Sequence, residues 1–145
     1  MIGGGRMILY RPVGLTELEL IAQADFERFP PRLPEQPIFY PVLSFEYAEQ
    51  IARDWNSTSG DSAGFVTRFE VDNEYVAKFE THVVGRRDIH QELWVPAEEL
   101  DEFNAHIVSG IAVEAAYYGD EFEGEIDAET NLPVNVVARH GMTRS

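Results

Sequence analysis

The segment formed by residues 38–55 constrains the fold of this chain most strongly, because a strand pattern runs directly into a helix pattern there. Residues 38–43 are rich in β-branched and aromatic side chains and follow a proline, which predicts a short strand. Pro41 places this strand at a sheet edge or a bulge, because proline has no N–H to donate. Apolar residues then recur at helical spacing behind Ser44, which predicts an amphipathic helix with Ser44 as its N-cap.

The remaining patterns predict a single α+β domain over residues 7–118, with a mixed or mostly antiparallel sheet and short helices. A stretch with four prolines in nine residues, 29–37, predicts a stiff loop that either forms a pocket wall or simply connects elements. Asp72 is expected to cap a short helical turn. Further strands are expected at 7–11 (closed by Pro12 and Gly14), 64–71, 80–84, 89–95 and 107–118 (broken at Ser109-Gly110). Helices are expected at 16–25 (capped by Thr16) and 97–106.

Residues 119–145 differ in character from the rest of the chain. Six acidic residues fall within 120–129, and few apolar residues follow them. Such a composition buries too little apolar surface to fix a chain firmly. We therefore expect an acidic C-terminal tail that is mobile or marginally ordered.

Composition excludes several classes of function. The chain has no cysteine, which excludes disulfides, thiolate nucleophiles and cysteine-ligated metals. No apolar run approaches the roughly 20 residues that span a bilayer, and residues 1–6 do not resemble a secretory signal, so a cytoplasmic location is expected. The histidines show no paired metal-ligand spacing, and there is no Gly-x-Ser-x-Gly motif, so neither a metal site nor a serine nucleophile is expected.

The charge balance restricts the possible partners. Twenty-six acidic and 11 basic side chains give a net charge of −15. Such a surface repels nucleic-acid backbones and anionic lipid, so we expect neither nucleic-acid nor membrane binding. It suits docking on a basic protein, although solubility alone also accounts for it, and a local basic pocket can still hold one diphosphate.

Four residues form the candidate site, and their side chains suit cleavage of an N-glycosidic bond. Arg11 can hold a diphosphate through bidentate hydrogen bonds. Tyr40 can stack on a flat heterocycle near Ser44, in the turn expected to line a cleft. Glu92, which shares a strand face with His90 and Trp94, can bind a ribose hydroxyl and stabilise an oxocarbenium ion. Alternatively, Arg11 is an ordinary surface arginine, and Glu92 is paired with a neighbouring arginine.

The order of several motifs resembles a small bacterial family that usually carries the label "ADP-ribosylation/crystallin". The similarity covers roughly residues 7–118 and is strongest over 28–118. The motifs are Leu9-Tyr10-Arg11, Phe39-Tyr40, Tyr47-Ala48-x-x-Ile51-Ala52-x-x-Trp55, Gly64-Phe65-Val66-Thr67-Arg68-Phe69 and Glu92-Leu93-Trp94-Val95-Pro96.

The layout is similar to the ADP-ribosyltransferase-like fold, and this resemblance implies NAD as the substrate. It implies that Arg11, with Tyr10 beside it, contacts NAD, that Tyr40 or Ser44 stands for the middle motif, and that Glu92 is catalytic. The activity implied is an ADP-ribosyltransferase or an NAD glycohydrolase. A second hypothesis is a non-catalytic, acidic protein-binding module of the immunity or inhibitor type on the same fold.

Overall fold

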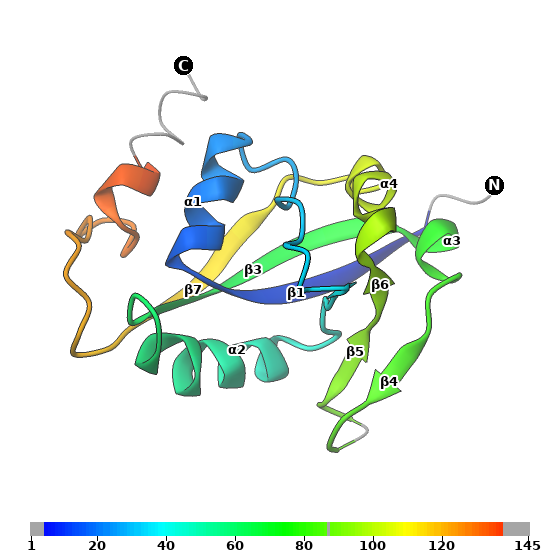
Figure 1. Ribbon diagram of the computed structural model, residues 1–145, viewed down its shortest axis with the longest axis horizontal. Helices are drawn as coiled ribbons and strands as arrows, with labels where there is room; N and C mark the ends of the chain where they lie inside the picture. Colours follow the sequence, from blue (N-terminus) through cyan, green and yellow to red (C-terminus); the bar gives the residue numbers. More distant parts are fainter. Residues whose placement is uncertain (1–4, 87, 138–145) are drawn as a thin grey trace.

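The computed structural model describes residues 5–86 and 88–137, and these form an α+β fold as predicted (Figure 1). None of the helices in this described part is long and apolar enough to cross a membrane. The strands are β1 (Arg6–Gly14), β2 (Ile38–Phe39), β3 (Ala63–Asp72), β4 (Thr81–Val83), β5 (Gln91–Leu93), β6 (Val95–Pro96) and β7 (Ala112–Tyr118). The helices are α1 (Leu15–Gln23), α2 (Phe45–Asp54), α3 (Asn73–Val76) and α4 (Leu100–Ala105), with 3₁₀ turns η1 (Asn56–Thr58) and η2 (Ala97–Glu99).

An antiparallel sheet runs through the middle of the domain, which confirms the predicted strand orientation. Strand β3 lies between β1 and β7, and a bulge separates Val66 from Thr67 on the β7 side. Val42 forms single bridges with Tyr10 of β1 and with Glu92 of β5, and β5 pairs with β4. Val42 therefore links the three-stranded sheet to the β4–β5 hairpin.

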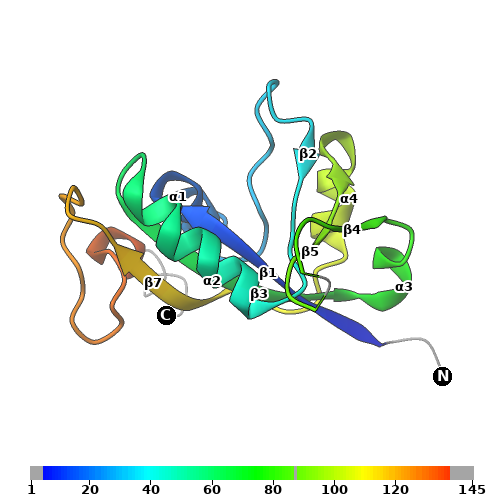
Figure 2. The ribbon, with the colours of Figure 1, turned by 90° about the horizontal axis from the view of Figure 1, so that it is seen from below.

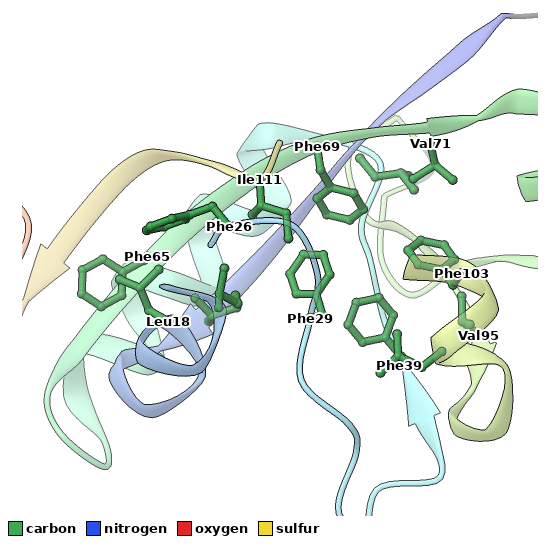
Figure 3. Close-up of a cluster of buried hydrophobic side chains, with 14 of the residues drawn as sticks. Leu18, Phe26, Phe29, Phe39, Phe65, Phe69, Val71, Val95, Phe103 and Ile111 are labelled. Atoms are coloured by element: carbon green, nitrogen blue, oxygen red, sulfur yellow. The ribbon is translucent and has the colours of Figure 1, made fainter. Parts of the chain in front are cut away.

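The main core lies on the sheet face that α1 covers, and we call it the α1 face. Six phenylalanine rings are buried there, and three of their ring contacts form a chain from Phe69 through Phe29 and Phe39 to Phe103 (Figure 3). The centroid distances along this chain are 4.8, 5.1 and 5.5 Å. The fully buried rings are Phe29, Phe39, Phe65, Phe69 and Phe103.

Helix α2 covers the opposite face, which we call the α2 face, with a smaller cluster (Figure 2). Ala48 and Ala52 are its buried helical residues, and they pack with Val42 and Val66. Strand β3 approaches the helix closely at Gly64, where a Cβ atom would overlap the carbonyl oxygen of Ala52. Small side chains on both elements therefore set the distance between α2 and the sheet.

The predicted helix starts were partly right. The Ser44 hydroxyl accepts a hydrogen bond from the Tyr47 amide at 3.1 Å, and Asp72 caps α3 through the Tyr75 amide at 3.0 Å, as predicted. The predicted Thr16 cap was wrong, because α1 already begins at Leu15, with Gly14 in the N-cap position and no side-chain cap.

Several strand boundaries also differ from the predictions. Strand β1 continues through Pro12 to Gly14, because the side of β1 to which the Pro12 nitrogen points carries only the single bridge at Tyr10. The expected strand at 38–43 contains only Ile38–Phe39, with Val42 as an isolated bridge. The expected strand at 89–95 is divided into β5 and β6. The expected strand at 107–118 is interrupted around Ser109-Gly110 as predicted, with Ile107 in an isolated bridge and β7 beginning at Ala112.

The described part of the acidic segment, 119–137, packs against the domain. Val136 is buried in the main core and Leu132 lies against it. Ile126 and Pro133 form a bridge, and the Asn135 amide donates to Glu19 of α1 at 2.7 Å. The domain boundary at 118 stays a prediction, and residues 138–145 of the expected tail lie outside the described residues.

Candidate functional site

Arg11 lies on the α1 face, because it stands two residues from each of the buried residues Leu9 and Val13, and residues two apart in a strand point to the same face. Its guanidinium donates to both carboxylate oxygens of Glu17, at 2.7 and 2.9 Å. It also donates to the Tyr40 carbonyl at 3.3 Å. Only 10% of its side chain is exposed. Arg11 therefore ties the first turn of α1 to the chain that leaves β2, through charge-assisted bonds in a partly dry setting.

Glu92 and Tyr10 lie on the α2 face. The Val42 bridges place Tyr10, Val42 and Glu92 in one row across the strands, and directly paired residues share a face of the sheet. The Tyr10 ring meets Phe45 of α2 edge-on at 6.0 Å. The Glu92 carboxylate accepts hydrogen bonds from the Tyr47 hydroxyl and from the Trp94 indole, both at 2.8 Å. Glu92 is thus held between a helix and its own strand.

The bond to Glu92 affects the titration of Tyr47. Burial raises the pKa of the Tyr47 phenol to about 12, and the hydrogen bond and the negative charge of Glu92 add to this effect. Loss of the phenolic proton would place two negative charges side by side. Tyr47 therefore acts as a donor toward Glu92 and is not a base at neutral pH.

An aromatic patch adjoins Glu92, and we call Tyr40, His82 and Trp94 the Trp94 patch. The Tyr40 and Trp94 rings meet edge-on at 5.9 Å, and His82 stacks on Trp94 at 3.8 Å. Tyr40 is 37% exposed and Trp94 38%. The exposed carboxylate of Glu80 lies 3.5 Å from the His82 ring nitrogen. The patch is therefore a fixed aromatic surface with acidic residues beside it.

Ser44 and His90 hold the β4–β5 hairpin against α2. The Ser44 hydroxyl donates to the Ile89 carbonyl at 2.8 Å, in addition to capping α2. The Arg86 amide donates to His90 Nδ1 at 2.8 Å, and His90 Nε2 lies 2.9 Å from the Gln50 side-chain oxygen. Because Nδ1 is an acceptor, Nε2 carries the proton and donates to Gln50. The hydroxyl of Ser44 is thus used inside the fold.

The structure does not bring all the predicted site residues together. Arg11 lies on the α1 face, whereas Tyr10 and Glu92 lie on the α2 face. Tyr40 connects the two faces indirectly: its carbonyl accepts from Arg11, and its ring contacts Trp94, whose indole donates to Glu92. The single cleft expected to contain Arg11, Tyr40 and Glu92 is therefore not formed, and the individual roles stay predictions.

Sequence reasoning missed the internal partners of both charged residues. Glu17 and Tyr47 engage Arg11 and Glu92, but the sequence contains only a weak signal for them. The spacing of Glu92 and Trp94 by two residues did indicate a shared face, and the indole–carboxylate bond confirms it. Across the described ranges, no three His, Asp or Glu side chains gather closely enough to hold a metal ion.

No family model matches this chain, and comparison with curated proteins also finds no match. The resemblance to the ADP-ribosylation/crystallin family and to the ADP-ribosyltransferase-like fold therefore stays a prediction.

Proposed function

We propose that the protein is a non-catalytic binding module that docks a basic protein partner through the Trp94 patch. The observation that carries the proposal is the exposed Tyr40–Trp94 pair, which is fixed by the bond from Trp94 to Glu92 and by His82 stacking. Tryptophan and tyrosine are the residues most enriched among interface hot spots. Side chains already held in place lose little conformational entropy when a partner binds.

Charge supports a basic partner. The chain carries a net charge of −15, and Glu80, beside the patch, has 84% of its side chain exposed. A shallow hollow next to Trp94 is lined by Phe79, Pro96, Lys78, Glu80 and Glu99. Lys78 already pairs with Glu99 at 3.3 Å, so Glu80 is the carboxylate there that faces a partner's cation. An arginine or lysine side chain would find an aromatic face and the Glu80 carboxylate together there. Long-range attraction would also speed the encounter with a positively charged surface.

An NAD-handling role receives less support from the same geometry. The proposed chemistry needs the diphosphate-binding Arg11 and the ribose-binding Glu92 at one substrate. Glu17 engages two nitrogens of Arg11, and Glu92 is bonded to Tyr47 and Trp94 on the other face of the sheet. Both charged groups therefore have internal partners and point away from each other.

Site-specific photo-crosslinking tests the proposal. A benzophenone amino acid replaces Tyr40 in one variant and Leu20 in a second, control variant. Leu20 is exposed on α1, away from the Trp94 patch. Both variants are expressed in cells of the source organism and irradiated. We expect one dominant adduct from position 40 that contains a protein of positive net charge. Its yield should fall at high salt, because screening weakens charge attraction.

Tryptophan substitutions supply the control for this experiment. Trp94→Ala should abolish the adduct at position 40, whereas Trp55→Ala should leave it unchanged. Trp55 is a matched control because its side chain is 72% exposed and contributes nothing to the patch. The same adducts from both positions, an acidic partner, or an adduct that survives Trp94→Ala would contradict the proposal.

A further inference from the structure

Arg32, in the proline-rich loop, is a partly buried cation without a carboxylate partner. Among the described residues, no side chain or carbonyl forms a hydrogen bond or an ion pair with its guanidinium, and its Nε atom is buried. This is unusual in a chain with 26 acidic side chains. The arginines that do pair with carboxylates are Arg6, Arg11, Arg53, Arg68 and Arg86.

A second guanidinium lies near Arg32. The Arg11 guanidinium carbon is 4.7 Å from the centre of the Phe39 ring, and that of Arg32 is 6.0 Å from the same centre. Glu17 is the carboxylate that neutralises Arg11, and both of its oxygens are used. Burial lowers the pKa of Arg32 and the charge of Arg11 lowers it further, whereas the charges of Glu17 and Tyr40 partly offset this shift. Two guanidinium groups and one carboxylate leave this part of the fold with an excess of positive charge.

The loop that carries Arg32 is anchored at both ends. The Asn104 side chain of α4 bonds to the amide and the carbonyl of Phe29, at 2.9 and 3.0 Å. The Pro37 carbonyl accepts from the Ala97 amide at 2.8 Å, beside the β2–β6 pair. Between these anchors, the Leu33 amide donates to the Gln36 side chain at 3.0 Å. The loop, which projects beside β2 in Figure 2, is therefore held at both ends.

We infer that Arg32, assisted by Arg11, binds a small oxyanion, either a phosphate group or a carboxylate, on the α1 face. A guanidinium offers a planar fork of N–H donors that matches both kinds of oxyanion. The anion accepts a hydrogen bond from the buried, unpaired Nε–H of Arg32. Arg11 remains bonded to Glu17, and its positive charge attracts the anion. The two guanidinium groups lie on the opposite face of the sheet from Glu92, and Tyr40 of the Trp94 patch contacts Arg11 through its carbonyl.

Nuclear magnetic resonance of the arginine Nε–H groups tests the inference directly. The full chain is titrated with inorganic phosphate and, in a second arm, with acetate, while sodium chloride keeps the ionic strength constant. We expect a saturable shift of the Arg32 Nε–H signal. A shift that saturates with phosphate indicates a phosphoryl ligand, and a shift that saturates with acetate indicates a carboxylate ligand. Either result supports the site.

Three variants make the test specific. Arg32→Gln should weaken binding, read from the Arg11 signal, by about tenfold or more, because one charge-assisted contact is lost. The affinity of Arg32→Lys for the anion should lie between those of the wild type and Arg32→Gln, because lysine keeps the charge but lacks the planar set of N–H donors. Arg28→Gln, an exposed arginine nearby, should bind as the wild type does. No saturable shift with either anion, or equal binding by Arg32→Gln and wild type, would overturn the inference.

Discussion

The two faces of the central sheet use aromatic residues differently: the buried phenylalanines all lie on the α1 face, whereas the aromatic rings of the α2 face are only partly buried. On the α1 face, the ion pair between Arg11 and Glu17 is largely enclosed. The α2 face carries tyrosines that bond to carboxylates, from Tyr47 to Glu92 at 2.8 Å and from Tyr117 to Glu49. Apolar rings suit a closed core, whereas tyrosine suits a boundary where one end is dry and the other wet. The α1 face therefore provides most of the stability, and the α2 face presents groups to the outside.

The largest effect should come from the α1 face. Phe69→Ala removes a fully buried ring that contacts Phe29 and Phe103, and it should lower the free energy of unfolding by about 3–5 kcal/mol. Urea denaturation followed by circular dichroism measures this. Tyr117→Phe on the α2 face removes only a hydroxyl and should cost about 1–3 kcal/mol. Equal losses for the two variants would show that the faces do not differ as described.

The ion pair on the α1 face should contribute less than the phenylalanine core. Arg11→Met leaves the Glu17 carboxylate, whose side chain is 20% exposed, without its partner, and should cost about 2 kcal/mol. Arg11→Met combined with Glu17→Leu removes both charges and should recover at least half of that loss, because two apolar side chains can replace an enclosed pair. Denaturation midpoints of the single and double variants check this. A double variant less stable than Arg11→Met would refute it.

The smallest effect concerns pH and belongs to the α2 face. The ordinary pKa of tyrosine is 10.0, and Tyr47 has its pKa raised to about 12 in the folded protein. The stabilisation from this shift is therefore fully present below pH 10 and is lost as the pH rises toward about 12. Because Tyr47 is only partly buried, the loss should be about 1 kcal/mol.

Tyr47→Phe isolates this contribution from the other tyrosines. The stability advantage of the wild type over Tyr47→Phe should shrink between pH 10 and about 12, as followed by urea denaturation at each pH. An advantage that stays constant over this interval would show that Tyr47 titrates no differently in the folded and unfolded chains.

Local patterns in the sequence predicted those parts of the fold that depend on neighbouring residues. The Ser44 and Asp72 caps and most of β3 follow from side-chain chemistry and alternation within a few residues. The alternation of Glu92 and Trp94 within one strand was predictable for the same reason. The early end of β2 at Phe39 was not predictable in this way, because pairing with the neighbouring strand resumes only at Val42.

The arrangement of the candidate site depends on contacts between segments that are far apart in the sequence. The spacing of apolar residues within one segment does not reveal such contacts. Arg11 and Glu92 fall on opposite faces because Val42 pairs with Tyr10, and a shift of that register by one residue would have put them together. The partnership of Tyr47 with Glu92 likewise joins residues 45 positions apart. Arg32 lay in a loop where the sequence predicted a possible pocket wall but not an unpaired cation.

The most direct test of this account is the release of nicotinamide from NAD by the purified protein, with Arg11→Ala and Glu92→Gln measured beside it. These two residues lie on opposite faces of the sheet, so we expect no release that depends on both of them. Thermal denaturation of each variant verifies that it remains folded. Nicotinamide release by the wild type that disappears in both folded variants would contradict the account and would establish a shared NAD site.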